Sequence, residues 1–127
     1  MKEIVATKEA PTAIGPYSQA VRIKPMEMLF CSGQIPLDPV TGQLVEGPAA
    51  IQAQKVMENL KAIIEASGFT MDDVVKTTIY LIDLGAFNEV NKVYESYFAA
   101  SFPARTTVQV AALPRGAVVE IDAMVCK

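Results

Sequence analysis

The chain has 127 residues, a net charge of −3 and no histidine, and 51% of its residues are hydrophobic. This length predicts one domain, residues 1–127, large enough to bury a hydrophobic core. The acidic pI of about 4.9 argues against nucleic acid as a partner, because phosphate binding requires a basic face. Without histidine, most zinc sites and the Ser-His-Asp and Cys-His arrangements are excluded, so acid–base chemistry depends on Asp, Glu, Lys, Tyr or a thiol.

Cysteine spacing and hydropathy narrow the class of protein further. Cys31 and Cys126 form neither a CxxC motif nor a zinc-binding spacing. No signal peptide is recognised, so we expect a cytoplasmic chain with free thiols. No stretch approaches the roughly 20 apolar residues that a membrane span needs. Because so apolar a small domain is expected to cover part of its surface with another copy, the composition predicts an oligomer.

The first predicted elements are two strands and a loop. Residues 18–23 and the strongly apolar residues 26–32 flank Lys24-Pro25, which predicts a β-hairpin. Residues 33–47 are rich in proline, glycine and aspartate and are therefore predicted to form a loop.

Two helices follow, with a strand between them. The first is predicted to have Pro48 at its first helical position and Gly68 as its left-handed stop. Apolar residues recur between them at spacings of three and four. Residues 74–82 are β-branched and predict a buried strand. The second helix is expected to start near Asp83, and its apolar stripe consists of Phe87, Val90, Tyr94, Tyr97 and Phe98.

Two strands, residues 105–112 and 118–126, complete the predicted order β-β-α-β-α-β-β. Two helices cannot cover both faces of such a sheet, so we expect an α+β two-layer domain with both helices on one face. Strand alternation predicts that Val108 and Ile121 face the helices. The other face is then a mixture of polar and apolar groups, which suits a subunit interface that also holds a polar site.

Arg105 and Glu120 are the charged residues of these last strands that we single out for chemistry. By alternation, both are expected on the less apolar face. Arginine offers a planar fork that matches a carboxylate, and glutamate can transfer protons. Asp122 shares the face of Glu120, and the pattern does not choose between the two carboxylates. An ordinary solvated position is the competing interpretation for each charged residue.

Polar residues near turns are further candidates. Tyr17 follows the turn Gly15-Pro16, where its ring could cover a pocket or pack structurally. Ser32 and Gly33 lie where a strand runs into a loop, a place that often presents backbone and hydroxyl groups to a ligand. Asn88 lies near the start of the second helix, where a simple early-turn polar residue is the competing interpretation.

Several motifs together resemble the RidA (YjgF/YER-type) imine deaminase family over essentially the whole chain. They are AIGPYSQA at 13–20, SGQIP at 32–36, VKTT at 75–78, FPAR at 102–105, and Leu113-Pro114 with Val119-Glu120-Ile121. Each motif alone is weakly specific, but their order along the chain is a strong indication. The resemblance implies a chorismate-mutase-like fold and a homotrimer with ligand sites in the clefts between subunits.

The resemblance also implies a role for each candidate residue. Arg105 binds the substrate carboxylate, and Glu120, rather than Asp122, orients or activates the attacking water. Tyr17 closes the cleft from a neighbouring subunit.

The remaining residues implied by the resemblance surround the ligand. Ser32 and Gly33 line the cleft, and Asn88 lies at its edge. Many members carry cysteine where this chain has Thr107, so a role of the backbone carbonyl is retained there and a thiol role is not.

The implied activity is hydrolysis of 2-aminoacrylate, 2-aminocrotonate and their imine tautomers to 2-oxo acids and ammonia, with no cofactor and no metal. Pyridoxal-phosphate-dependent dehydratases release such intermediates, so a functional link to them is implied. The alternative is a regulatory module that binds a small carboxylate without turnover. RNA cleavage, proposed for some relatives, is disfavoured by the acidic pI and the missing histidine.

Overall fold

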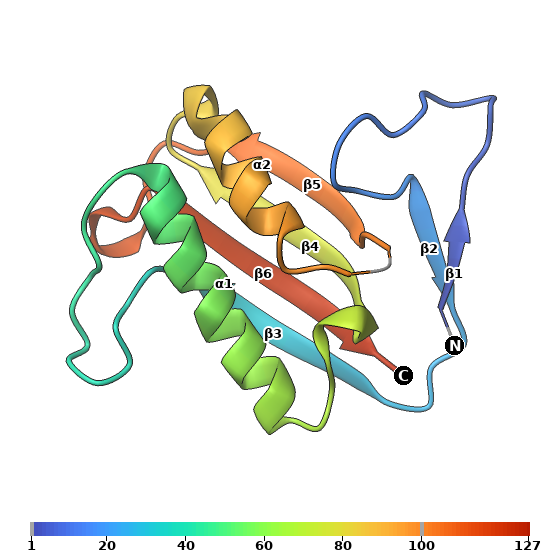
Figure 1. Ribbon diagram of the computed structural model, residues 1–127, viewed down its shortest axis with the longest axis horizontal. Coiled ribbons are helices and arrows are strands. Elements are labelled where there is room, and N and C mark those ends of the chain that lie inside the picture. Colours follow the sequence, from blue (N-terminus) through green and yellow to red (C-terminus); the bar gives the residue numbers. More distant parts are fainter. Residues whose placement is uncertain (1, 100) are drawn as a thin grey trace.

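The computed structural model, which describes residues 2–99 and 101–127, has two layers, with both helices on one face of a four-stranded sheet (Figure 1). The elements are β1 (Lys2–Val5), β2 (Ala20–Ile23), β3 (Met28–Gln34), α1 (Ala49–Ala66), β4 (Val74–Leu81), α2 (Phe87–Glu95), β5 (Ala104–Gln109) and β6 (Val119–Cys126). Short 3₁₀ turns span Met71–Asp73, Leu84–Ala86 and Pro114–Gly116. The predicted α+β class, with two helices against one face of a mixed sheet, is confirmed. None of the described helices is long and apolar enough to cross a membrane.

The main sheet has the strand order β3-β6-β4-β5. β6 is antiparallel to both of its neighbours, and β4 is parallel to β5. The helices serve as crossovers: α1 connects β3 to β4, and α2 connects β4 to β5. Thr77 pairs with Arg105 on one side and with Ala123 on the other, which fixes the face of each of these side chains.

The predicted hairpin of residues 18–23 with residues 26–32 is wrong. β2 pairs instead with β1, which the sequence pattern did not predict, in a separate two-stranded sheet. The N–H groups of Met26 and Glu27 donate to the Lys127 carbonyl at 3.0 and 2.9 Å. These bonds start β3 beside the end of β6, so its strand partner is the C-terminal strand rather than the preceding one.

Helix α1 follows its apolar periodicity closely. Ala53, Val56, Leu60 and Ile64 are fully buried against the sheet, and Gly68 adopts a left-handed φ of 85° just after the helix, as predicted. Pro48 is the N-cap rather than the first helical residue. Proline suits either position, because the N–H group that it lacks would have no acceptor within the helix.

The core lies between the helices and the face of the sheet that they cover. Ile79, Ile121 and Val125 are fully buried there, so the predicted alternation of β6 is confirmed. The alternation assigned to β5 is wrong. Because Thr77, the register partner of Arg105, is buried beneath α2, Arg105 faces the helices and Val108 lies on the other face.

The other face of the sheet, here called the open face, is not covered by any described element of the chain (Figure 1). It carries exposed apolar side chains beside polar ones. Phe30 and Met124, which are register partners on β3 and β6, are 65% and 44% exposed. This is the mixed character that the sequence led us to expect on one face.

Candidate functional site

Arg105 is surrounded by one amide and three aromatic rings. Its Nη1 donates to Asn91 Oδ1 at 2.8 Å. The guanidinium carbon lies 5.5 Å from the ring centres of Tyr17 and Phe87 and 5.3 Å from that of Tyr94. These distances lie within the range of cation–π attraction. In the described part of the chain, no carboxylate forms an ion pair with this arginine, so its charge is not neutralised.

The electrostatics of this cage favour an anionic ligand. Burial lowers the pKa of the Arg105 guanidinium, while Tyr94 and Tyr17 act in the opposite direction. Arginine nevertheless stays protonated in proteins, so a half-buried positive charge remains. A desolvated charge is costly until an opposite charge pairs with it. Asn91 occupies one nitrogen of the fork, and the described contacts leave the others for a carboxylate.

Tyr17 reaches Arg105 because the next residue, Ser18, is hydrogen-bonded to the residues just before β5. Ser18 donates from its backbone N–H to the Pro103 carbonyl at 3.1 Å and from its hydroxyl to the Phe102 carbonyl at 2.5 Å. The tyrosine therefore lies beside the arginine of its own chain. This contact is made within one chain, and closure of a cleft between subunits by Tyr17, which the resemblance implied, stays a prediction.

Glu120 lies on the open face, in register with Tyr80 of β4. Its neighbour Asp122 is already engaged, since it accepts from the Tyr80 hydroxyl and from the Thr78 N–H, both at 3.1 Å. The described side chains include no hydrogen-bond partner of Glu120. Of the two carboxylates that the sequence left in competition, Glu120 is therefore the one with free oxygens.

Ser32 and Gly33 form a β-bulge beside Glu120. The pairing of β3 with β6 shifts between Cys31 and Gln34, which leaves this dipeptide outside the regular ladder. The Glu120 carboxyl group lies directly against Gly33. The structure thus brings Gly33 and Glu120 together on the open face.

Helix α2 contributes Asn91, rather than Asn88, to the surroundings of Arg105. Asn88 is exposed, and none of its described contacts reaches the guanidinium. The sequence interpretation missed Asn91, although helical spacing carried the signal. Phe87, Asn91 and Tyr94 recur at intervals of four and three, so they share one face, and Asn88 lies one residue off it.

Thr107 lies two residues after Arg105 and on the same face of β5. Its side chain is in register with Ile79 of the buried core. The Thr107 hydroxyl oxygen is buried and has no hydrogen-bond partner among the described residues. A role of this residue in ligand binding stays a prediction.

Arg105 and Glu120 thus lie on opposite faces of the sheet, and the expectation of a shared face is wrong. Thr77, the register partner of Arg105, is buried with its hydroxyl 2.7 Å from that of Tyr94, on the helix side. Tyr80, the partner of Glu120, lies three residues further along β4, which reverses the face. Within one chain, the two candidates are therefore separated by the sheet.

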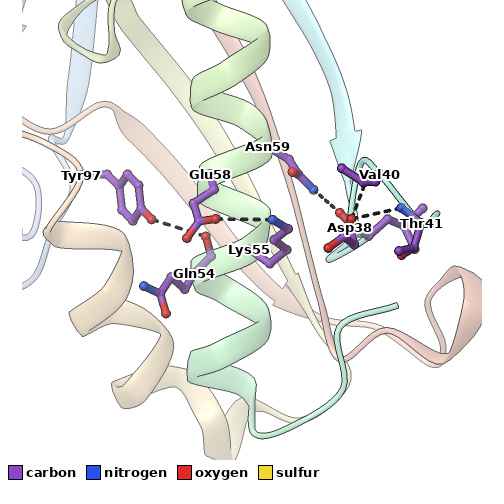
Figure 2. Close-up of polar contacts among 9 residues, drawn as sticks. Asp38, Val40, Thr41, Gln54, Lys55, Glu58, Asn59 and Tyr97 are labelled. Carbon is purple, nitrogen blue, oxygen red and sulfur yellow. Dashed lines mark hydrogen bonds and ion pairs between the residues drawn. The ribbon is translucent and has the colours of Figure 1, made fainter. Parts of the chain in front are cut away.

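A second polar cluster joins α1 to the preceding loop and to Tyr97, in the segment that follows α2 (Figure 2). Asn59 donates to the Leu37 carbonyl at 2.9 Å. The Asp38 carboxylate accepts from the N–H groups of Val40 and Thr41 at 2.8 and 3.1 Å, which lowers the pKa of that carboxyl group. These hydrogen bonds stabilise a turn, so the lowered pKa of Asp38 is explained by the local structure and does not indicate a functional site.

The groove between the two helices lies apart from Arg105 and from Glu120. This groove has a volume of about 640 Å³, and Tyr97 is part of its wall. The Tyr97 hydroxyl donates to the Gln54 carbonyl at 3.4 Å (Figure 2). The groove touches neither Arg105 nor Glu120. In the described ranges, no three His, Cys, Asp or Glu side chains gather in a way that could hold a metal ion.

Comparison with known proteins identifies the family. Residues 7–127 match the family described as Endoribonuclease L-PSP. The chain belongs to this family. The predicted resemblance to RidA proteins is confirmed by a solved structure of RidA from the Antarctic bacterium Psychrobacter sp. PAMC 21119. That structure is 44% identical with a TM-score of 0.76, and the match covers 98% of this chain and 99% of the other.

Two further members of the family have different names. Protein DfrA of Myxococcus xanthus is 55% identical over 97% of this chain and 94% of its own length. The 2-iminobutanoate/2-iminopropanoate deaminase of Mus musculus is 47% identical over 98% of this chain and 90% of its own length. Imine deamination is therefore a function found in this family.

Proposed function

We propose that the chain hydrolyses small 2-imino acids, formed from enamines such as 2-aminoacrylate and 2-aminocrotonate, to 2-oxo acids and ammonia. The observation that carries this proposal is the unneutralised guanidinium of Arg105, held by Asn91 and three aromatic rings. A rigid fork with a free edge suits a carboxylate, which every 2-imino acid carries next to its reactive carbon. The named mouse deaminase supports the same substrate class.

We propose further that the working site is shared between copies of the chain. Glu120 lies on the open face and Arg105 on the covered one, so a second copy would supply the carboxylate to the arginine of the first. The exposed Phe30 and Met124 give the open face the apolar character of a subunit interface. A homotrimer, as the family resemblance implies, would contain three such sites.

The proposed mechanism uses positioning and one proton carrier. Arg105 fixes the substrate carboxylate, which presents the electrophilic imine carbon to water. Glu120 accepts a proton from that water as its oxygen bonds to the carbon and passes the proton to the nitrogen, which gives a carbinolamine. Glu120 then takes the remaining hydroxyl proton and passes it to the amino nitrogen as the carbon–nitrogen bond breaks, so ammonia leaves and the oxygen is retained as the carbonyl of the 2-oxo acid. Atoms balance with one water consumed, and the step needs no redox partner.

A coupled assay tests the proposal. A serine/threonine dehydratase generates the imine in place, and release of 2-oxo acid is followed with the wild-type chain, with Arg105→Ala and without added protein. We expect faster release with the wild type than with Arg105→Ala or without added protein. Arg22→Ala, at a surface arginine paired with Glu3 at 3.2 Å, is the matched control and should accelerate release like the wild type.

Two other outcomes would overturn the proposal. Binding of pyruvate or serine by a folded protein that does not accelerate release would indicate the regulatory module instead. The second outcome is an RNA-cleaving activity that stays with the chain through successive purification columns and is lost in Glu120→Gln. That result would indicate the activity named in the family description.

A further inference from the structure

Gly33 occupies a place where any side chain would collide with Glu120. A Cβ built on Gly33 would overlap Glu120 Oε2 and would lie 2.9 Å from Cδ and 3.2 Å from Cγ. The backbone does not demand glycine there, because Gly33 is not among the glycines with a positive φ. The three atoms nearest to such a Cβ all belong to the Glu120 side chain, so it is this side chain that requires a bare α-carbon at position 33.

The bulge explains how the two residues come so close. β3 and β6 are neighbours, and Glu120 lies on β6 next to Ile121, whose register partner is Gln34. The Ser32-Gly33 bulge interrupts the regular pairing at this point, and the Glu120 carboxyl group lies against Gly33 of the bulge. Both residues belong to one chain, so this contact does not depend on assembly.

We infer that Gly33 is a positioning residue, whose missing side chain leaves the space in which the Glu120 carboxyl group is held for proton transfer. The inference rests on the proposed function and adds a residue that acts through Glu120 rather than on the substrate. A methyl group at position 33 would displace the carboxyl group, which is the flexible end of a side chain, and would leave the backbone in place. The cost would therefore fall on the reaction and not on the fold.

The test is a double-mutant cycle that combines Gly33→Ala with Glu120→Asp. Aspartate is one methylene shorter, so its carboxyl group withdraws from the space that the new methyl group takes. We expect Gly33→Ala to lower kcat about 100-fold, the usual penalty for a misplacement of about 1 Å, with KM changed less. In the Glu120→Asp background, the same substitution should cost less than about threefold. A structural or ligand-contact role of Gly33 would give equal losses in both backgrounds and would overturn the inference.

Gly85→Ala is the matched control. Gly85 also lacks a positive φ, and a Cβ there would approach Asp83 Oδ1 at 3.0 Å. This variant should keep the wild-type rate. The melting temperatures of both glycine variants should stay close to that of the wild type. Unfolding of Gly33→Ala at a much lower temperature would contradict the claim that only the Glu120 carboxyl group moves.

A readout without turnover separates this inference from the proposed function. The carboxyl carbon of Glu120, followed by ¹³C NMR, should change its chemical shift in Gly33→Ala and not in Gly85→Ala. If the wild type shows no deaminase activity but this shift occurs, the proposed function fails and the steric contact stands. If the wild type is active and Gly33→Ala matches it in rate and in chemical shift, the inference about Gly33 fails alone.

Discussion

The two faces of the main sheet hold their charged residues in different ways. On the covered face, Arg105 finds all of its described neighbours within its own chain, and α2 supplies three of them. On the open face, Glu120 has free oxygens and lies on a surface with exposed Phe30 and Met124. The comparison teaches that one chain builds the surroundings of the proposed carboxylate-binding arginine by itself and leaves the proposed proton carrier facing outward, where our proposal places another copy.

The largest expected effect concerns the open face. Glu120→Gln removes the proposed proton carrier while keeping its shape, so kcat should fall by about 1,000-fold, within the usual range for a general acid–base group. Asp122→Asn should cost much less, because Asp122 is already engaged by Tyr80 and Thr78. Steady-state kinetics of the two variants decide between the carboxylates. A greater loss in Asp122→Asn would reverse their assignment.

A substitution of Arg105, on the covered face, should have the next largest effect on activity. Arg105→Lys keeps the charge but loses the planar fork and the stacking on the rings, so kcat/KM should fall about 10- to 100-fold, equivalent to one charge-assisted hydrogen bond. Arg22→Lys is the control, at an exposed pair with Glu3. Equal activity of Arg105→Lys and wild type, with a carboxylate substrate, would show that no two-point clamp operates there.

Mixing two inactive proteins tests the comparison itself. Arg105→Ala and Glu120→Gln chains are unfolded together, refolded at equal concentration and assayed. If each site takes its arginine and its glutamate from different copies, about one quarter of the sites are intact, and about that fraction of the wild-type rate returns. If both residues of a site come from one chain, no mixture contains an intact site, and activity stays absent.

The smallest expected effect concerns the stability of the covered face. Burial raises the pKa of Tyr94 from 10.0 to about 12. The folded state therefore holds this proton more tightly than the unfolded chain, so the free energy of unfolding is unaffected below pH 10. Between pH 10 and about 12 it falls by about 1.4 kcal/mol per pH unit.

Tyr94→Phe should remove this alkaline loss. It should also cost about 1 kcal/mol at neutral pH, because the Thr77 hydroxyl loses its 2.7 Å partner. Urea unfolding from pH 8 to pH 11.5 measures both effects. Identical pH dependence in the variant and the wild type would mean that another group causes the alkaline loss.

Much of the fold could be predicted from the sequence, because the spacing of apolar residues follows which side of a helix or strand is buried. α1 and β6 lie against the core, and their apolar periods predicted which of their residues are buried. The predicted hairpin failed because strand pairing depends on contacts distant in sequence, here those of Met26 and Glu27 with Lys127. Local turn residues do not encode such contacts.

The sequence selected the candidate residues but did not predict how they are arranged. Along β5, apolar and polar residues occur at both parities, so alternation gave Arg105 the wrong face; its position is fixed by the pairing with Thr77. Asn91 was within reach of sequence reasoning, since it shares the helical face of Phe87 and Tyr94. The contact between Gly33 and Glu120 was not, because the shift in pairing at the bulge decides it.

The opposite orientations of Arg105 and Glu120 also bear on how such a protein can change during evolution. Because side chains alternate along a strand, loss of one residue between Pro103 and Arg105 would carry the guanidinium from the helix side to the open side. Nearly every motif residue would still be present in the sequence, yet the aromatic cage would be empty. The spacing of these residues along the chain therefore matters as much as their identity, because a shift of one position separates Arg105 from the rings that surround it.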